Sequence, residues 1–298
     1  MPVLMTKQIT IVVLTFNCAE VIERTLTAAR QVGGKIICID SFSTDSTVDI
    51  LRNSDCELHQ RRFKHYSDQR NWAIENFGNR AEWQLHLDAD EILDANAIAS
   101  IQAVIGNPGR YDGYMLRRRT YFLGKELRHA GTGIWQLRLF RSGLGACEDR
   151  LYDQHFICKG SVGRLGGWLH DMNCGTLSEW TARHNRWSDL EAQELLRPVA
   201  EDSSALQARL SVDPRQRRRM YKGWYYRSPL ILRAWGFFFF RYIIMLGFLD
   251  GRAGLLFAFF QALWFRMLVD AKLIEARSAA ANTAAPAAAI PAELETSR

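Results

Sequence analysis

The chain has 298 residues, of which 48% are hydrophobic, so it can bury a large α/β core with an appendage, and disorder of the whole chain is excluded. Its formal net charge of +6 favours anionic partners without choosing among nucleic acid, phospholipid and a nucleotide. There are six cysteines, none in a Cys-x-x-Cys pair, and the N-terminal residues lack a signal-peptide pattern. We therefore expect reduced thiols in the cytoplasm.

The first ninety residues alternate between apolar, β-branched runs and helical patterns. Strands are predicted at 9–15, 35–39, 57–60 and 83–87, and helices at 19–30, 48–53 and 68–77. This alternation predicts a doubly wound α/β sheet. Ligands of such sheets bind beyond the carboxyl ends of the strands, where Asp40 and Asp88 are expected.

The pattern changes after about Gly113. Strands are predicted at 113–121 and 135–141, glycine-rich turns up to Gly167, and helices at 177–196 and 199–212. We divide the chain into an α/β domain at 1–212, a basic and aromatic helical region at 213–275, and a flexible alanine-rich tail at 276–298.

Two carboxylates separated by one residue, Asp88 and Asp90, follow the apolar run at 83–87. Such a pair can converge on Mg²⁺ or Mn²⁺, which take oxygen ligands and keep positions open for phosphate oxygens. The same spacing also occurs in solvated acidic turns, so the pair alone does not decide between the two interpretations.

Four ordered motifs, VVLTFNCAEVIERTL, IDSFSTDST, SDQRNWA and WQLHLDADE, together resemble the family 2 glycosyltransferases, which have a GT-A fold. The likeness extends from about Ile9 to Lys272 and is strongest to enzymes that build lipopolysaccharide cores and exopolysaccharides. The resemblance implies an inverting transfer of a sugar from a nucleotide-diphosphate sugar, most often a UDP-sugar, with divalent Mg or Mn as cofactor.

The resemblance also implies roles for individual residues. The expected nucleotide-sugar contacts are Thr15 and Asn17 in the first loop, Asp40 on the base N–H, Ser41 beside it, Arg70 near phosphate or sugar, and Asp88 near ribose or sugar. Asp90 is the expected metal ligand. Ser41 stands where many family members have an acidic residue, which leaves the identity of the nucleotide base open.

An inverting transfer needs a carboxylate that takes the proton of the acceptor hydroxyl. The segment CEDRLYDQHF offers Glu148 and Asp149, with Asp149 the preferred base and Glu148 the second choice. Asp153, four residues on, would share a helical face with Asp149. The alternative is that these acids only pair with nearby arginines. His170, in GWLHD, is a candidate metal or pyrophosphate contact, or else a hydrogen-bonded structural residue.

Two long apolar segments, 229–249 and 252–269, follow a stretch rich in basic and aromatic residues. Arg233, Arg241 and Arg266 interrupt them, so simple spanning helices are disfavoured and interfacial helices, with arginines reaching the headgroups, are expected. These features predict a peripheral protein on the inner face of the cell membrane with a saccharide or lipid-linked acceptor. The basic run at 217–219 abuts this lipid-like segment, which argues against nucleic acid as a partner.

Two other functions compete with sugar transfer. A nucleotidyltransferase would need a glycine-rich phosphate loop near the N-terminus, and TFNCAEVIERT has no glycine. A non-catalytic nucleotide-sugar-binding scaffold at the membrane is disfavoured by the acids at 88, 90, 148 and 149 but not excluded by them.

Overall fold

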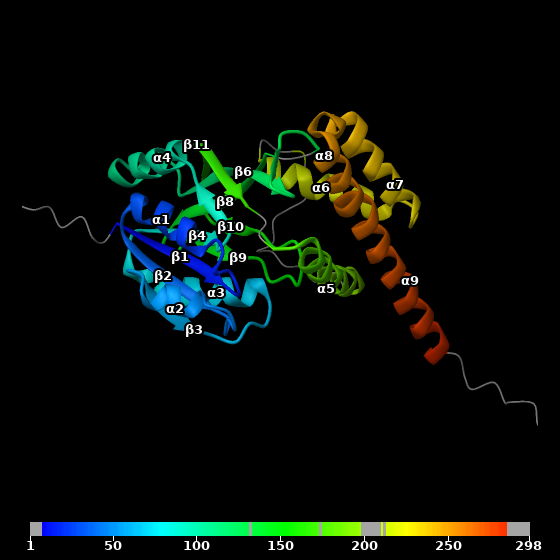
Figure 1. Cartoon of the computed structure of the whole chain (residues 1–298), viewed down its shortest axis with the longest axis horizontal. Helices are drawn as coiled ribbons and strands as arrows, with labels where there is room; N and C mark the ends of the chain where they lie inside the picture. The colour runs from blue at the N-terminus through cyan, green and yellow to red at the C-terminus, as the bar shows by residue number, and fades with distance from the viewer. Residues whose placement is uncertain (1–7, 131–132, 173–174, 198–209, 211–212, 285–298) are drawn as a thin grey trace, which may run out of the picture.

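The computed structural model describes residues 8–130, 133–172, 175–197, 210 and 213–284. A strand-containing α/β domain occupies one end of the molecule and an assembly of C-terminal helices the other, with α5 between them (Figure 1). The layered α/β architecture expected from the sequence is confirmed.

The sheet begins with four parallel strands in the order β3 (Glu57–Gln60), β2 (Lys35–Asp40), β1 (Ile9–Thr15) and β4 (Trp83–Asp88). These are the four strands predicted from the apolar runs. Side chains of β1 alternate between the two faces of the sheet, as the pleat requires. Ile11 and Val13 join a core with α1 (Ile22–Val32), whereas Val12 packs with residues of α3 (Tyr66–Phe77). The continuous apolar sequence of β1 is therefore explained by the burial of its side chains on both faces of the sheet.

The sheet continues through strands of mixed direction. In order after β4 they are β8 (Ile134–Arg141), β6 (Gly113–Phe122), β11 (Val162–Asp171) and β5 (Glu91–Leu93), with β7 (Lys125–Leu127) paired to β6. β8 is antiparallel to both β4 and β6, and β11 runs parallel to β6. A separate hairpin joins β9 (Gly145–Cys147) to β10 (Phe156–Cys158).

Sequence reasoning missed α4 (Ala95–Gly106), β11 and the short strands β5, β7, β9 and β10. The glycines of β11 were interpreted as turns, which is wrong. Gly167 has a φ of +80°, and a Cβ there would lie 2.1 Å from the backbone nitrogen of Ala97. The glycine therefore lets β11 pass against the start of α4, where Asp94 accepts a hydrogen bond from the Ala97 N–H.

The remaining helices are α2 (Thr47–Arg52), α5 (Leu177–Leu196), α6 (Pro214–Arg227), α7 (Leu232–Phe239), α8 (Gly251–Ala258) and α9 (Phe265–Ala284). Helical turns η2 (Phe240–Ile244), η3 (Gly247–Asp250) and η4 (Phe259–Trp264) connect α7, α8 and α9. The helix predicted at 199–212 lies outside the described residues, apart from residue 210. α9 continues beyond residue 275 into the segment that was expected to be a flexible tail.

The three arginines of the apolar segments point inward, so the prediction that they reach lipid headgroups is wrong. The Nε atom of Arg233 lies 2.9 Å from the Asp270 carboxylate, and Nη1 of Arg266 lies 2.8 Å from that of Glu191. Nε of Arg241 donates to the carbonyl oxygen of Ala130 at 2.7 Å. Buried charge needs such partners, and the helical assembly supplies them internally.

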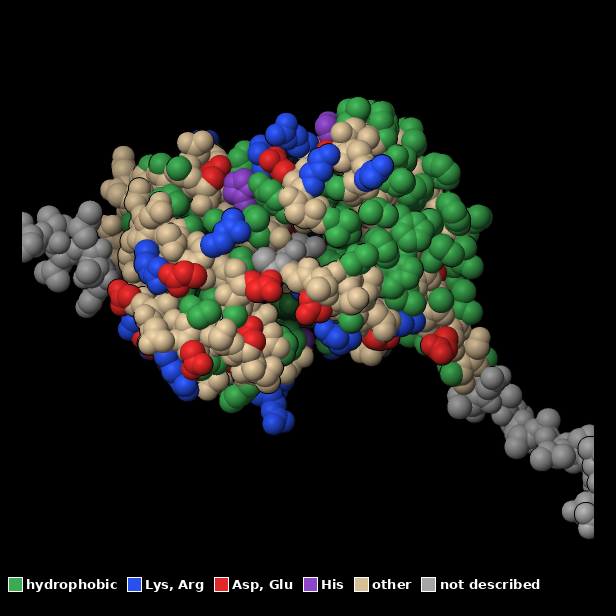
Figure 2. Space-filling model, viewed as in Figure 1, with side chains coloured by type: hydrophobic (Ala, Val, Ile, Leu, Met, Phe, Trp, Pro, Cys, Tyr) green, Lys and Arg blue, Asp and Glu red, His purple; other side chains and the backbone are tan. Residues whose placement is uncertain are grey.

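Because these arginines turn inward, the exterior of the assembly is apolar. We call this exterior the apolar helical surface; it comprises the exposed residues Leu232, Trp235, Phe239, Phe240, Ile243, Ile244, Phe248, Leu249, Leu255, Leu256 and Phe259. Figure 2 shows hydrophobic side chains covering this end of the molecule. By length and composition, one helical run, Gly247–Ala281, could cross a membrane, although half of its apolar window is buried in the protein.

Candidate functional site

The loops after β1 and β2 are joined by hydrogen bonds. The hydroxyl of Thr15 donates to the Asp40 carboxylate at 3.2 Å, and the Ser41 N–H donates to the Thr15 carbonyl oxygen at 2.9 Å. Asn17 has a φ of 43°, a conformation that asparagine tolerates, and its N–H donates to the hydroxyl of Ser43 at 2.9 Å. Four residues predicted to contact the nucleotide sugar, namely Thr15, Asn17, Asp40 and Ser41, therefore lie together at one edge of the sheet.

Asp40 is fully buried, and its carboxylate organises this edge. Besides Thr15, it accepts hydrogen bonds from the Ser43 N–H at 2.9 Å and the side-chain amide of Gln60 at 3.3 Å. These contacts are those of a loop-stabilising carboxylate, the alternative role for an acid at this position. Its contact with the nucleotide base stays a prediction.

Asp88 lies between two buried arginines. Nη2 of Arg70, from α3, donates to both carboxylate oxygens at 2.8 and 3.1 Å, and Nη2 of Arg138, from β8, donates at 2.9 Å. Burial raises the pKa of Asp88, but the two guanidinium groups outweigh it and hold that pKa well below its usual range. Asp88 is therefore a fixed anion, and Arg70 and Arg138 are oriented toward it.

Asp90 lies in a concentration of negative charge. Burial, followed by the charges of Asp171, Asp88 and Glu91, raises its pKa to about 7. Asp171 ends β11 opposite Glu91 in β5, and the Met172 N–H donates to the Asp90 carbonyl oxygen at 3.0 Å. The fold thus brings the carboxyl end of β11 beside the Asp88–Asp90 pair.

Sequence reasoning missed Asp171 and two further residues of this region. Asp171 offered a usable signal, since it follows a strand as Asp88 does, but that strand was not predicted. The first is Arg183, on α5, whose positive charge opposes the rise of the Asp90 pKa. The second is Tyr66, the first residue of α3; burial and the negative charge of Asp88 raise the pKa of Tyr66 to about 12.

Glu148, one of the two candidate bases, is buried and tied to the C-terminal helices. Nη1 and Nη2 of Arg219, from α6, donate to its two oxygens at 2.6 and 2.8 Å, and the His155 N–H donates at 2.9 Å. Although burial raises its pKa, the hydrogen bond to His155 and the Arg219 charge lower the pKa to about 2. Both oxygens are occupied in this conformation.

Asp149 has an exposed side chain. It lines a shallow cavity of about 270 Å³ whose other walls include Arg61, Asp68 and Asn71, on and before α3. The expectation that Asp153 shares a helical face with Asp149 is wrong, because residues 148–155 form a loop and Asp153 has a φ of 56°.

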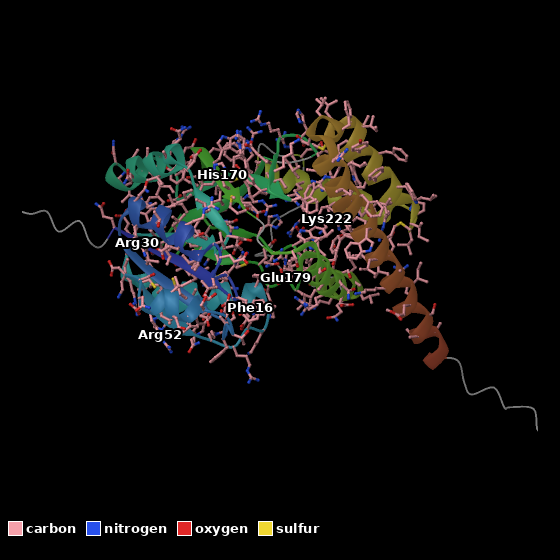
Figure 3. The ribbon with its side chains drawn as sticks, in the orientation of Figure 1. Phe16, Arg30, Arg52, His170, Glu179 and Lys222 are labelled. Atoms are coloured by element: carbon pink, nitrogen blue, oxygen red, sulfur yellow. The ribbon has the colours of Figure 1, made fainter. Side chains whose placement is uncertain are left out.

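His170 lies on the other side of β11 from Asp171, because successive strand residues face opposite sides of the sheet. Its Nδ1 is 3.0 Å from the hydroxyl of Tyr121, and burial lowers its pKa. Figure 3 shows His170 on β11, well apart from Phe16 in the loop after β1. The structure does not bring His170 together with Asp90, the other predicted metal ligand.

Within the described ranges, no group of three or more His, Cys, Asp or Glu side chains is arranged to hold a metal ion. The charges of Asp88 and Asp171 nevertheless both act on Asp90, and carboxylate oxygens are the ligands that Mg²⁺ and Mn²⁺ prefer. A cation held by Asp90 and Asp171 with phosphate oxygens of a ligand fits this donor set.

A family model described as "Glycosyl transferase family 2" matches residues 10–162. The match runs from β1 to the start of β11 and includes Asp40, Asp88, Asp90, Glu148 and Asp149. Together with the mixed α/β sheet, it confirms the predicted GT-A fold.

Curated relatives carry similar descriptions. An uncharacterized glycosyltransferase of Rickettsia bellii is 30% identical over 116 residues, 38% of this chain and 39% of that protein. One from Rickettsia prowazekii is 26% identical over 152 residues, 50% of this chain and 48% of that protein. The chain thus spans half or less of the length of these relatives. The crystal structure of S. aureus TarS 1–349 in complex with UDP-GlcNAc has 13% identity and a TM-score of 0.45, with 90% of this chain and 92% of that one covered.

Proposed function

Because the chain belongs to glycosyl transferase family 2, we propose that it is an inverting, metal-dependent enzyme that transfers a sugar from a UDP-sugar to a saccharide or lipid-linked acceptor. The observation that carries the proposal is the placement of Asp40 at the carboxyl end of β2 and of Asp88 and Asp90 at that of β4, the two parallel strands on either side of β1, because α/β sheets bind their ligands at this edge.

In the proposed complex the nucleotide lies over the loops after β1 and β2, bounded by Thr15, Asn17 and Ser41. Arg70 and Asp88 lie further along the same edge and contact the sugar or phosphates. Arg70 is buried and already oriented by Asp88, so little side-chain entropy is lost when a ligand binds.

Asp90, with Asp171 as the added partner, would hold the Mg²⁺ or Mn²⁺ ion. Such an ion neutralises charge that develops on the leaving diphosphate. Among the chain's own residues, Arg183 supplies positive charge to Asp90 and Arg70 donates to Asp88, while the charges of both acids act on Tyr66.

Asp149 remains our preferred base. Glu148 accepts three hydrogen bonds and has a pKa of about 2, so it is a poor proton acceptor at neutral pH, whereas Asp149 is free to meet an acceptor hydroxyl. The acceptor would approach along the loop between β9 and β10.

The apolar helical surface supports a peripheral location on the cytoplasmic face of the membrane. The surface exposes large aromatic and aliphatic side chains, while Arg217, Arg218 and Arg227 of α6 lie exposed beside it. This combination matches interfacial binding to anionic lipid. Washed membranes should retain the native protein; full recovery in a detergent-free supernatant would contradict this location.

The transferase proposal is tested with a panel of nucleotide sugars. We expect at least one UDP-sugar to be hydrolysed or transferred, with turnover that is lost in EDTA and restored by Mn²⁺. The assay also contains Mn²⁺, with membrane lipid extract as acceptor. If UDP-sugars bind under these conditions but are neither hydrolysed nor transferred, the result favours a binding protein instead.

A further inference from the structure

Arg241 is a buried cation without a carboxylate partner. It lies in η2 with an exposed fraction of 9%, and its Nε donates to the Ala130 carbonyl oxygen. The rings of Phe237 and Phe257 flank the guanidinium at 5.5 and 5.1 Å. Among the described residues, no ion pair engages Arg241 and no hydrogen bond engages its terminal nitrogens, so most of its donor capacity is unused.

Arg241 and Arg266 stack on the same ring, that of Phe237, at 5.5 and 5.8 Å from its centroid, and the charges of two further arginines also act on Arg241. Burial and the positive charges of Arg218, Arg266 and Arg118 lower the pKa of Arg241 to about 9. We call these four residues the arginine cluster. They come from η2, α6, α9 and β6, so the cluster lies where the helical assembly meets the α/β domain. Arg241 is buried and Arg266 is mostly buried, whereas Arg118 is partly exposed and Arg218 is exposed. Like charges brought together destabilise the fold unless an anion joins them.

Two members of the arginine cluster also have donors to spare. Arg118 pairs with Asp171 through Nη1 at 3.2 Å, and Arg266 pairs with Glu191 through Nη1 at 2.8 Å. The Nε of each is buried and, within the described part of the chain, has no hydrogen-bond partner. Their carboxylate partners fix the two side chains without using all of their donors.

The position of the arginine cluster relates it to the site. Asp171 pairs with Arg118 and also acts on Asp90, so the cluster adjoins the acidic region. The arginine cluster lies toward the C-terminal helices. The loops after β1 and β2, where the nucleotide is proposed to bind, instead approach α3, whose Gln69 contacts Ser41. Ile243 and Ile244 of the apolar helical surface follow Arg241 two and three residues along the chain.

We propose that the arginine cluster is a phosphate-binding subsite that receives a phosphate or diphosphate group of the acceptor. Guanidinium groups pair with phosphate oxygens through several parallel hydrogen bonds, and a phosphate would supply the missing counter-charge. The assignment to an acceptor rests on the proposed transferase function, whereas phosphate binding does not.

The test is equilibrium binding to the full chain in detergent micelles, with the donor site saturated by UDP and Mg²⁺. The probes are inorganic phosphate, farnesyl phosphate and uncharged farnesol. We expect the phosphates to bind and Arg241→Gln to weaken them by about tenfold or more, the loss typical of a charged hydrogen bond. Arg252→Gln, which removes an exposed arginine of α8, is the matched control and should change affinity by less than about twofold.

The probes distinguish the source of the phosphate. Equal affinity for inorganic and farnesyl phosphate indicates a phosphorylated saccharide, and much tighter binding of farnesyl phosphate indicates a lipid-linked group; either result supports the subsite. Farnesol binding as tightly as farnesyl phosphate, or unchanged phosphate affinity in Arg241→Gln, overturns it. Should Arg241→Gln not fold, Arg118→Gln, at a partly exposed position, provides the same comparison.

Hydrolysis of UDP-sugars by the same wild-type preparation separates the two proposals. If phosphate binding depends on Arg241 but the protein neither hydrolyses nor transfers UDP-sugars, the result supports the subsite and rejects the transferase function. If the protein hydrolyses UDP-sugars but binds no phosphate, the result supports the transferase function and rejects the subsite.

Discussion

Arg219 of α6 pairs with both carboxylate oxygens of Glu148, in the loop between β9 and β10. Lys222, one turn further along α6, contacts Asp153 of the same loop at 3.0 Å. In Figure 3, Lys222 lies on the part of the C-terminal helices nearest the α/β domain. The first C-terminal helix therefore fixes the loop that carries the proposed base.

The neighbouring acids of this loop should respond differently to substitution. Glu148→Gln removes half of a buried ion pair and leaves Arg219 unpaired, so the free energy of unfolding should fall by about 3–5 kcal/mol. Asp149→Asn, at an exposed position, should change stability by less than about 0.5 kcal/mol and retain donor binding but lose transfer. Denaturant unfolding, UDP binding and transfer assays measure the three quantities. Full transfer by Asp149→Asn would move the base elsewhere.

Asp90→Ala should abolish metal-stimulated turnover and leave the fold intact. The substitution removes a carboxylate from a region of mutual repulsion, so no loss of stability is expected to accompany the loss of activity. Turnover at increasing Mn²⁺ and the thermal unfolding midpoint are the measurements. Asp49→Ala, which removes an exposed acid of α2, is the control and should keep wild-type turnover. Unchanged Mn²⁺ dependence in Asp90→Ala would reject Asp90 as the ligand.

The Arg233–Asp270 pair joins the two apolar segments, and each partner is almost completely buried. Asp270→Asn should lower the free energy of unfolding by about 3–5 kcal/mol, because Arg233 is left charged in an apolar setting. The double variant Arg233→Met with Asp270→Leu should recover most of that loss, since no buried charge remains. A double variant no more stable than Asp270→Asn would show that the pair itself specifies the helix arrangement.

Acid should destabilise the protein partly through His184. Its Nδ1–H donates to the Trp180 carbonyl oxygen at 2.8 Å, and burial lowers its pKa to about 4. The unfolded chain takes up this proton near pH 6.5, so stability present above that pH is lost as pH falls toward 4. Between pH 7 and 5 the wild type should lose about 2 kcal/mol more than His184→Gln. Denaturant unfolding at both pH values checks this, and parallel losses would contradict it.

Gly167→Ala should destabilise the α/β domain. A Cβ at this position would clash with the backbone of Ala97, and a φ of +80° disfavours any side chain. The expected loss is about 2 kcal/mol or more in the free energy of unfolding. Gly143, which also has a positive φ but open space around it, provides the comparison. Gly143→Ala should cost about 1 kcal/mol, and equal losses would show that conformation alone matters.

The parallel half of the sheet was predictable because β1 and β2 are continuous apolar runs and β4 is a mostly apolar one, with the short strand β3 expected between β2 and β4 along the chain. β1 and β3 begin and end at the predicted residues, and β2 and β4 end at Asp40 and Asp88. The placement of Asp40 and Asp88 at the carboxyl ends of strands follows from that pattern alone. β11 was not predictable, because its glycines serve close packing against α4 and resemble turn residues in a sequence.

Amino-acid order alone determined the α/β class, the family and the acids at the strand ends, because local periodicity and short motifs carry that information. Tertiary structure decided which side chains meet. It placed Asp171 beside Asp90, locked Glu148 to Arg219 and turned Arg233, Arg241 and Arg266 inward. These contacts join residues from 37 to 111 positions apart. Burial and charge pairing at such separations depend on packing that no local pattern encodes.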